Sequence, residues 1–248
     1  MSRIINVVSN DTHVYDLISN LVIELSKSKM VCLIDFGFGL NQIIYLFDEY
    51  PKNDLREFLI GEKNQNDVLN KVMHNLSIIK TNSMFFDYKA HKNEIKDLIN
   101  KVSFDFEYIF LVGEVGDLEI LDFRNLVSSE IFILIDNKLG SVMFAKKILK
   151  RAWKFKNLKN KKLLLNNHKT IKEIKGDMLS KEKIEDILKC EILYVKPKLL
   201  MGSLIQKRSL MQLVSAVENN KCVITNYKKK YLGVFGYFRR RLYEKFEQ

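Results

Sequence analysis

The stretch that decides the fold lies near the start of the chain and reads Ile4-Ile5-Asn6-Val7-Val8-Ser9-Asn10-Asp11-Thr12-His13-Val14-Tyr15-Asp16-Leu17. Residues 4 to 8 are a short apolar run of strand length. From Val14 to Lys27, apolar side chains recur at positions 14, 17, 18, 21 and 25, which is the spacing of one helix face. A buried strand that leads directly into an amphipathic helix is the first half of a βαβ unit.

The same alternation continues along the chain. Further strands are expected at 31–34, 76–79, 108–112, 131–135, 163–165 and 192–195, and helices near 54–60, 66–73, 92–102, 118–127, 141–156, 180–188 and 207–219. Continuous apolar strands between amphipathic helices are typical of a parallel sheet that is covered on both faces. We therefore predict an α/β protein with a mostly parallel, doubly wound sheet, forming one domain over residues 1–226, and a C-terminal segment over 227–248.

Composition narrows the functional class. The 248 residues carry a net charge of +11, which points to an anionic partner, although abundant Lys, Asn and Ile make part of this charge compositional. Three isolated cysteines (Cys32, Cys190 and Cys222) fit a reducing compartment and not a disulfide scaffold. The four histidines show no metal-ligand spacing, so no metal site is expected. No apolar run is long enough to span a bilayer or to form a signal peptide core.

Several segments, in order, resemble the MinD/ParA group of P-loop ATPases, which includes the MinD-like regulators of flagellar number. VCLIDFGFGLN at 31–41 is similar to the family's VLLIDADLGLRN, and NDLREFLIGEK at 53–63 is similar to YDLADVLEGEK. FEYIFL at 106–111 is similar to FDYVIID, and 178–197 resembles MLSxEDVxEILxIPLLGVIP. The resemblance implies a P-loop NTPase fold of the deviant Walker A class.

The loop after the first strand departs from the family pattern SGKGGVGKT and retains only Ser9 and Val14. A phosphate-binding loop needs glycines for close backbone approach, a lysine for the phosphate charge and a hydroxyl for magnesium. By resemblance, the nucleotide-binding positions are Ser9, Asn10, Asp11, Asp16, Leu17, Asp35 and Asn166.

Most of these positions carry the wrong chemistry. The resemblance places the two family lysines at Asp11 and Asp16 and the magnesium-binding threonine at Leu17. The second of the family's paired aspartates becomes Gly37, and the metal-side aspartate becomes Val112. Asp35 and Asn166 keep the family residue types, the latter at the adenine-reading position, although both also suit ordinary strand-end and loop positions. We expect no catalytic residues, no resident metal and no cofactor, with ATP and Mg²⁺ bound only if the resemblance outweighs the lost motif.

The last residues, YLGVFGYFRRRLYEKFEQ from Tyr231, predict an amphipathic helix. An apolar stripe at helical spacing opposes a basic face, as in helices that lie in a membrane surface. The residues expected to bind the membrane are Tyr231, Leu232, Phe235, Phe238, Arg239, Arg240, Arg241, Leu242 and Phe246. A terminal helix docked on the domain or on a partner is the alternative; MinD proteins, by resemblance, end in a basic targeting helix at this place.

A second basic segment covers residues 146–162, where nine lysines and arginines occur without an acid. It predicts either a solvated outer helix, the favoured interpretation, or a DNA-binding surface like that of ParA relatives. Trp153 and Phe155 within it are expected to be core or interface anchors and not base-stacking residues.

The leading hypothesis is a non-catalytic, membrane-associated spatial regulator or scaffold. It would act in the cytoplasm at the inner face of the cell membrane and help to place a division site, flagellum, pilus or similar apparatus. Its expected partners are an anionic membrane surface and a protein, for example a MinD-type paralogue; the oligomeric state is open. The alternatives are a ParA-like partition factor that binds DNA through residues 146–162, and a still active MinD-type ATPase with an unusual site.

Overall fold

The computed structural model describes residues 2–9, 13–36, 53–81, 90–114, 118–168, 178–197 and 203–219. Within these ranges, the side chains of residues 13–16, 114, 118, 166–168, 195–197 and 203–209 are not described. The described strands form one sheet in the order β3-β4-β2-β5-β1-β6-β7-β8. All neighbours in this order are parallel except β3 and β4. The predicted α/β, mostly parallel sheet is therefore confirmed.

The elements follow the predicted alternation. The strands are β1 (Arg3–Ser9), β2 (Val31–Asp35), β3 (Asn70–Met73), β4 (Leu76–Lys80), β5 (Tyr108–Glu114), β6 (Glu130–Ile135), β7 (Asn160–His168) and β8 (Ile192–Pro197). The helices are α1 (His13–Leu25), α3 (Leu55–Leu59), α4 (Gln65–Val68), α5 (Lys92–Val102), α6 (Leu118–Val127), α7 (Leu139–Ala152), α9 (Lys181–Leu188) and α10 (Ser203–Asn219).

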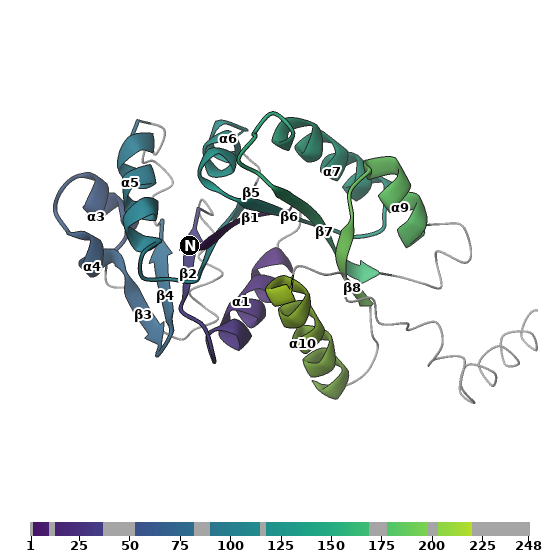
Figure 1. The fold of residues 1–248 in the computed structure, drawn as a ribbon, viewed down its shortest axis with the longest axis horizontal. Helices are drawn as coiled ribbons and strands as arrows, with labels where there is room; N and C mark the ends of the chain where they lie inside the picture. The colour runs from purple at the N-terminus through teal and green to yellow at the C-terminus, as the bar shows by residue number, and fades with distance from the viewer. Residues whose placement is uncertain are drawn as a thin grey trace, which may run out of the picture.

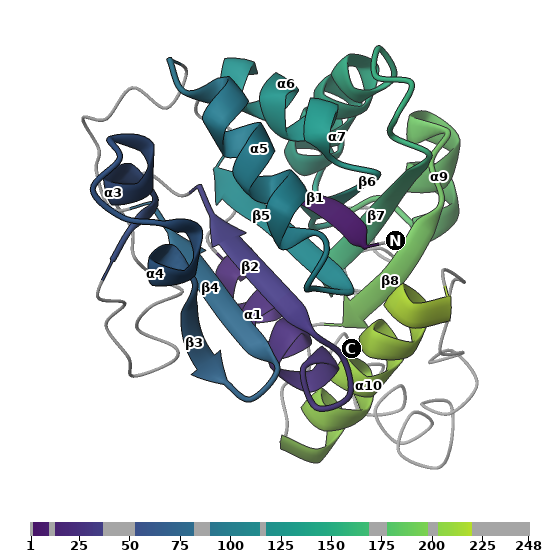
Figure 2. The same ribbon diagram turned by 60° about the vertical axis from the view of Figure 1, so that its left-hand side comes forward.

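Helices cover both faces of the sheet, as in a doubly wound fold. In Figure 1, α5, α6, α7 and α9 lie on one face, and α1 and α10 lie on the other. Figure 2 shows α1 and α10 side by side, and the two helices pack against each other. The burial of apolar strands between these layers supplies the main stabilising term, because every face of the central strands is removed from water.

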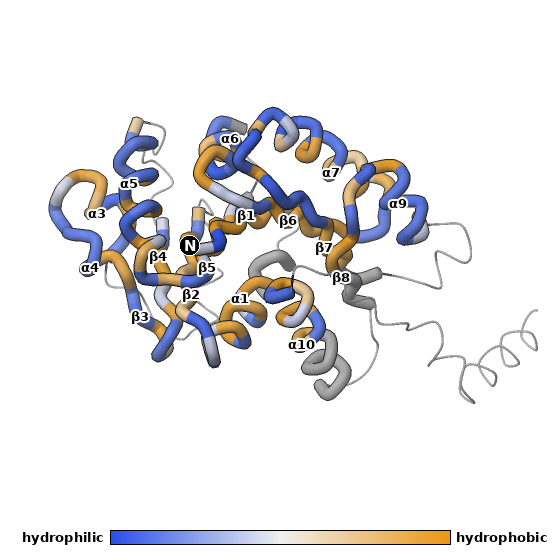
Figure 3. Tube along the Cα trace, in the orientation of Figure 1, coloured by the Kyte–Doolittle hydropathy of each residue, from blue (hydrophilic) through white to orange (hydrophobic). Residues whose placement is uncertain are grey.

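The core is divided accordingly. One buried cluster joins the sheet to α1 and α10 and includes Val7, Leu17 and Val112. On the opposite face, one cluster lies under α7 and α9 and another lies under α3 and α5. Figure 3 shows the strands coloured mostly as hydrophobic, whereas the outer turns of the helices are hydrophilic. Between the two clusters on the second face, α6 carries buried polar side chains, described below.

The predicted helix over 66–73 is wrong. The helix α4 ends at Val68, and residues 70–73 form β3, which pairs antiparallel with β4. Burial alternates along β3, which is the strand period. The Nδ2 group of Asn70 donates to the carbonyl oxygens of Asn53 and Val68, at 3.0 Å each, and these bonds fix the chain where the helix ends.

The basic segment 146–162 is also not one helix. Helix α7 ends at Ala152, and Lys161 and Lys162 already belong to β7. Two of its charges are paired, because Arg151 binds Asp122 and Lys162 binds Glu191. Trp153 is 57% exposed, so it is not a core residue and its expected role as an interface anchor stays a prediction, whereas Phe155 packs against the cluster under α7 and α9.

The C-terminal segment from residue 220 onward, with the predicted membrane-binding residues from Tyr231 to Phe246, lies outside the described residues. Within the described ranges, none of the helices has the length and apolar character needed to cross a bilayer.

Candidate nucleotide site

The carboxyl ends of β1, β2, β5 and β6 meet at one edge of the sheet, here called the carboxyl edge, where a doubly wound fold binds its ligands. Ser9 ends β1 and is buried, and its hydroxyl donates to the carbonyl oxygen of Leu134 in β6 at 3.2 Å. Asn10 and Asp11 lie outside the described residues, and so does the side chain of Asp16. The hydrogen bond of Ser9 therefore fixes the start of the candidate loop. The predicted effect of the negative charges of Asp11 and Asp16 on phosphate binding stays a prediction.

Leu17 occupies the position at which the resemblance places a magnesium-binding hydroxyl. Its side chain is 4% exposed and belongs to the apolar cluster that contains Val7 and Val112. Val112, at the expected metal-side position, is fully buried in the same cluster. Two positions that would hold a magnesium ion thus carry hydrocarbon inside the core, and neither offers an oxygen.

Asp35 ends β2 and is 4% exposed. In the sheet register it stands between Lys80 of β4 and Val112 of β5, so the three side chains share the face that α1 covers. The hydroxyl of Thr81 donates to the Asp35 carbonyl oxygen at 2.7 Å, and the Phe36 N–H donates to the Val112 carbonyl oxygen at 2.6 Å. These bonds hold the strand ends in place around the Asp35 carboxylate.

Lys80 is the only cation that the described residues place beside Asp35 in the sheet register. Burial lowers the pKa of its ammonium group, whereas the carboxylates of Asp54 and Glu57 oppose this shift. A partly desolvated lysine next to a buried carboxylate resembles the charge arrangement of a functional site. In the sequence, Lys80 could have been noticed because it directly follows the apolar residues of a predicted strand, at the carboxyl end where parallel sheets bind ligands.

A buried arginine, Arg124, lies at the carboxyl edge on the other face of the sheet, the face that α6 covers. Arg124 of α6 is 1% exposed and donates to the carbonyl oxygens of Val7, Leu111 and Gly113, which belong to β1 and β5. Its guanidinium also lies 6.0 Å from the centre of the Phe36 ring. Arg124 therefore ties α6 to the two strands that flank the candidate loop.

Sequence reasoning did not single out Arg124. The sequence offered only the helical spacing of Arg124 from Ile120 and Leu121, which are buried in α6; Asn125 and, just after the helix, Ser128 are buried as well. The neighbouring Asn6 of β1 donates from Nδ2 to Oδ1 of Asn125 at 2.8 Å, so these buried polar residues meet a polar residue in the central strand.

The last candidate, Asn166, lies in β7, two strands from β1, and its side chain is not described. In the described part of the chain, no group of His, Cys, Asp and Glu side chains could hold a metal ion. Of the predicted residues, the structure thus brings Ser9, Leu17 and Asp35 to one edge of the sheet.

Solved structures with the same architecture include the MinC:MinD cell division protein complex of Aquifex aeolicus. It superposes with a TM-score of 0.76 at 19% sequence identity, covering 91% of this chain and 99% of that chain. The cell division ATPase MinD of Pyrococcus furiosus gives a TM-score of 0.73 at 17% identity, covering 89% and 100%. The chain has the MinD/ParA fold.

A ParA family ATPase from Chlorobium tepidum supports the same assignment, with a TM-score of 0.67 at 17% identity over 88% of this chain and 93% of that one. No protein-family model matches the sequence. No curated protein matches it either. The sequence resemblance, not the shared fold, places the nucleotide loop after β1 and makes the carboxyl edge the candidate nucleotide site.

Proposed function

We propose that this chain is a MinD-like, non-catalytic scaffold that binds the inner face of the cell membrane. It acts as a spatial regulator that helps to place a division site, a flagellum, a pilus or a similar apparatus. The proposal combines a retained MinD/ParA fold, a candidate site without magnesium chemistry and a basic amphipathic C-terminal sequence.

The observation that carries the non-catalytic part is the burial of Leu17. This side chain is 4% exposed within the apolar core at the place of the family's magnesium-binding hydroxyl. Phosphoryl transfer depends on positioned cations that neutralise the developing charge. With hydrocarbon at Leu17 and Val112, and with acids at positions 11 and 16 where the resemblance places the family's lysines, these four positions supply no such cations to a triphosphate.

Membrane attachment is supported by the C-terminal sequence. Residues 228–247 hold seven lysines and arginines, among them Arg239, Arg240 and Arg241, against two glutamates, together with six aromatic side chains. Near an anionic surface each basic residue contributes on the order of 1 kcal/mol, to which apolar insertion adds. The MinD group, which this chain resembles, controls membrane binding by its C-terminal helix through ATP. Because this chain lacks the residues for that control, we propose that it binds the membrane constitutively or under the control of a protein partner.

A protein partner fits the fold as well. The MinD of Aquifex aeolicus was solved in a complex with MinC. We propose that this chain likewise works through protein contacts, with an intact MinD-type paralogue as one candidate.

The test is vesicle flotation of the full chain with phosphatidylglycerol-containing vesicles, together with an ATPase assay. We expect the full chain to float with anionic vesicles and not with neutral ones, and deletion of residues 228–248 to remove flotation. ATP turnover should stay at background with and without Mg²⁺. A full chain that stays at the bottom of the gradient would disprove membrane attachment, and measurable turnover would disprove the non-catalytic part.

A second candidate function, DNA binding in the manner of a partition factor, is favoured by one observation. Lys147, Lys150, Arg151 and Lys154 line a shallow pocket on the outer side of α7. Arg151 is neutralised by Asp122, so the lysines alone would contact phosphates. Salt-dependent retention of duplex DNA that is lost in a K147Q/K150Q/K154Q variant would support this function.

A further inference from the structure

The amino ends of the strands, with the loops that lead into them, form a continuous surface that we call the basal edge. Backbone hydrogen bonds join the loops in a row. The N–H groups of Val31, Glu107, Arg3, Ser129 and Lys159 donate in turn to the carbonyl oxygens of Asn75, Met30, Glu107, Ile4 and Ser129, at 2.8 to 2.9 Å. This row runs from β4 through β2, β5, β1 and β6 to β7 and makes the basal edge a rigid platform.

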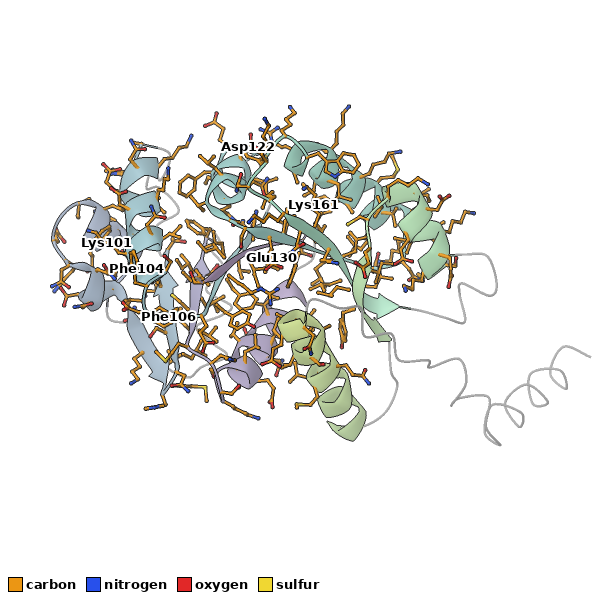
Figure 4. The ribbon with its side chains drawn as sticks, viewed as in Figure 1. Lys101, Phe104, Phe106, Asp122, Glu130 and Lys161 are labelled. Atoms are coloured by element: carbon orange, nitrogen blue, oxygen red, sulfur yellow. The ribbon has the colours of Figure 1, made fainter. Side chains whose placement is uncertain are left out.

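Large apolar side chains project from this platform. Phe104, in the loop between α5 and β5, is 88% exposed, and Trp153, at the end of α7, is 57% exposed. Met30, Met73 and Leu126 lie at the same edge and are 38%, 41% and 54% exposed. Figure 4 shows Lys101 and Phe104 at the end of α5 that leads into β5. The strands that follow Phe104 and Trp153 are three strand spacings apart, about 15 Å, so both aromatics fit one flat contact.

Positive charge surrounds these apolar side chains. Three basal carboxylates, Glu24, Asp186 and Glu191, are paired with Lys27, Lys189 and Lys162. Lys29 pairs with Glu107 at 3.0 Å. The remaining lysines are Lys101, Lys154, Lys156 and Lys159, and they outnumber the remaining acids, Asp105 and Glu218. Over the described ranges, no carboxylate forms an ion pair with Lys101, Lys154, Lys156 or Lys159. Exposed aromatics interleaved with unneutralised lysines match an anionic lipid surface, where rings enter the interface and ammonium groups meet phosphates.

Helix α10 ends at this same edge. Helix α10 runs toward the basal edge, since the Arg3 guanidinium at the start of β1 donates to the carbonyl oxygen of Val217. Glu218 lies close enough to Lys29 to raise the pKa of its ammonium group, after the larger effect of Glu107. Asn219, the last residue of α10 and the residue that precedes the C-terminal segment in the sequence, therefore lies at the basal edge.

From this placement we infer that the basal edge is a second membrane-contact surface, on which Phe104 and Trp153 enter the interface of an anionic bilayer while the flanking lysines bind lipid headgroups. The inference rests on the proposed membrane attachment and gives it an orientation. The carboxyl edge, with the candidate nucleotide site, then faces away from the bilayer and is open to protein partners.

Trp153 is the only tryptophan in the chain, so the full-length protein reports on this contact directly. Its fluorescence is recorded with vesicles of phosphatidylcholine and phosphatidylglycerol. We expect the emission to shift to shorter wavelength on binding, and brominated lipids to quench it. We also expect Phe104→Ser to weaken vesicle affinity about tenfold, the effect of losing one partly inserted aromatic ring.

The matched control is Leu139, which is 61% exposed at the start of α7 and therefore at the carboxyl edge. Leu139→Ser should leave vesicle affinity unchanged. In a Trp153→Phe, Leu139→Trp double variant the emission should not respond to vesicles, because the probe now faces away from the bilayer.

The outcomes separate this inference from the proposed function. Binding through the C-terminal segment with unchanged Trp153 emission would overturn the basal contact and leave membrane attachment intact. If the full chain bound no vesicles, both would fall. A Trp153 response to duplex DNA but not to vesicles would overturn the inference in favour of a nucleic-acid surface.

Discussion

At the carboxyl edge, the guanidinium group of Arg124 donates a hydrogen bond to the backbone of Gly113 and packs where a side chain at position 113 would lie. The Nη1 group of Arg124 donates to the Gly113 carbonyl oxygen at 3.2 Å, and a Cβ atom at Gly113 would lie 2.9 Å from the same nitrogen. Because glycine has no side chain, Gly113 leaves the space that the guanidinium group of Arg124 occupies. This pair fastens α6 to the strands beside the candidate nucleotide loop.

Replacing Arg124 with methionine should destabilise the fold strongly. The hydrogen bonds from the guanidinium group to the carbonyl oxygens of Val7, Leu111 and Gly113 would be lost in a site closed to water. A hydrogen bond from a charged group contributes about 1.5 to 3 kcal/mol, so we expect the three losses together to lower the free energy of unfolding by at least about 3 kcal/mol. Urea denaturation measures it. Arg151→Met is the control, because its partly exposed pair with Asp122 should contribute under about 1 kcal/mol. Equal losses in the two variants would contradict this role of Arg124.

Substitution of Gly113 by alanine should also destabilise the fold. The added methyl group would meet Arg124 Nη1 at 2.9 Å and the backbone carbon of Phe36 at 3.0 Å, and the backbone cannot move as a side chain can. Overpacking of this kind costs about 1 to 3 kcal/mol. Gly140→Ala, in α7, has no atom within 4 Å and should instead stabilise the helix by about 1 kcal/mol. Thermal unfolding of both variants tests the contrast in sign.

The sequence predicted most elements because the central strands are buried on both faces and read as continuous apolar runs. The prediction failed at β3, an edge strand of only four residues. The single helical turn of α4 comes directly before it, and over so few residues the apolar spacing does not distinguish a longer helix from a turn followed by a strand. The buried Arg124 escaped for a different reason. Its acceptors are backbone carbonyls of β1 and β5, and Val7 is 117 residues away along the chain. Every residue has a backbone carbonyl, so the amino-acid sequence does not show which of them will accept from an arginine. The positions of Ser9 and Asp35 in the fold followed from the sequence because each ends a recognisable strand, whereas their role in nucleotide binding stays a prediction.

The two described cysteines should resist alkylation. Burial raises the pKa of the Cys190 thiol to about 12, and it raises that of Cys32 further still. Only the thiolate reacts, so at pH 8 Cys190 should be modified about a thousandfold more slowly than an ordinary thiol with a pKa near 8.5. The assay uses a Cys222→Ser variant with iodoacetamide and mass spectrometry. In urea both cysteines should react fully. Fast labelling of Cys190 in the folded protein would contradict the burial of this thiol.

Asp136, which follows β6 at the carboxyl edge, should make stability depend on acid pH. Burial opposes its ionisation, but hydrogen bonds from Ser141 and Lys138 outweigh burial and lower its pKa. The Lys138 N–H donates to Oδ1 at 3.1 Å and its ammonium group lies 2.9 Å from Oδ2. A lowered folded-state pKa means that the stabilisation is complete above the unfolded value, about 3.9, and is lost as pH falls through the folded value.

Asp136→Asn should therefore lower the free energy of unfolding by about 1 kcal/mol at pH 7, and the difference from the native protein should vanish in strong acid. Urea denaturation from pH 7 into strong acid, down to about pH 2, would follow this convergence, which should begin only below the unfolded-state pKa of about 3.9. Asp186→Asn is the control, because that carboxylate is exposed on α9 and should change stability little at any pH. A loss at Asp136 that stays constant over the whole range would show that its charge is not the cause.

Leu17→Thr restores the hydroxyl that the MinD/ParA resemblance places at this position, and we expect it to destabilise the protein without creating nucleotide binding. Leu17 lies in the core with Val7 and Val112, so the variant removes buried hydrocarbon and buries a hydroxyl, at a cost of about 2 to 4 kcal/mol. Leu21→Thr is the matched control, since Leu21 is fully buried one turn later in the same helix and has no place in the resemblance. Both variants should lose similar stability in urea, and neither should bind Mg-ATP by calorimetry. If Leu17→Thr alone gained Mg²⁺-dependent ATP binding, the loop at 9–16 would be competent for phosphate despite its sequence, and the non-catalytic assignment would have to be abandoned.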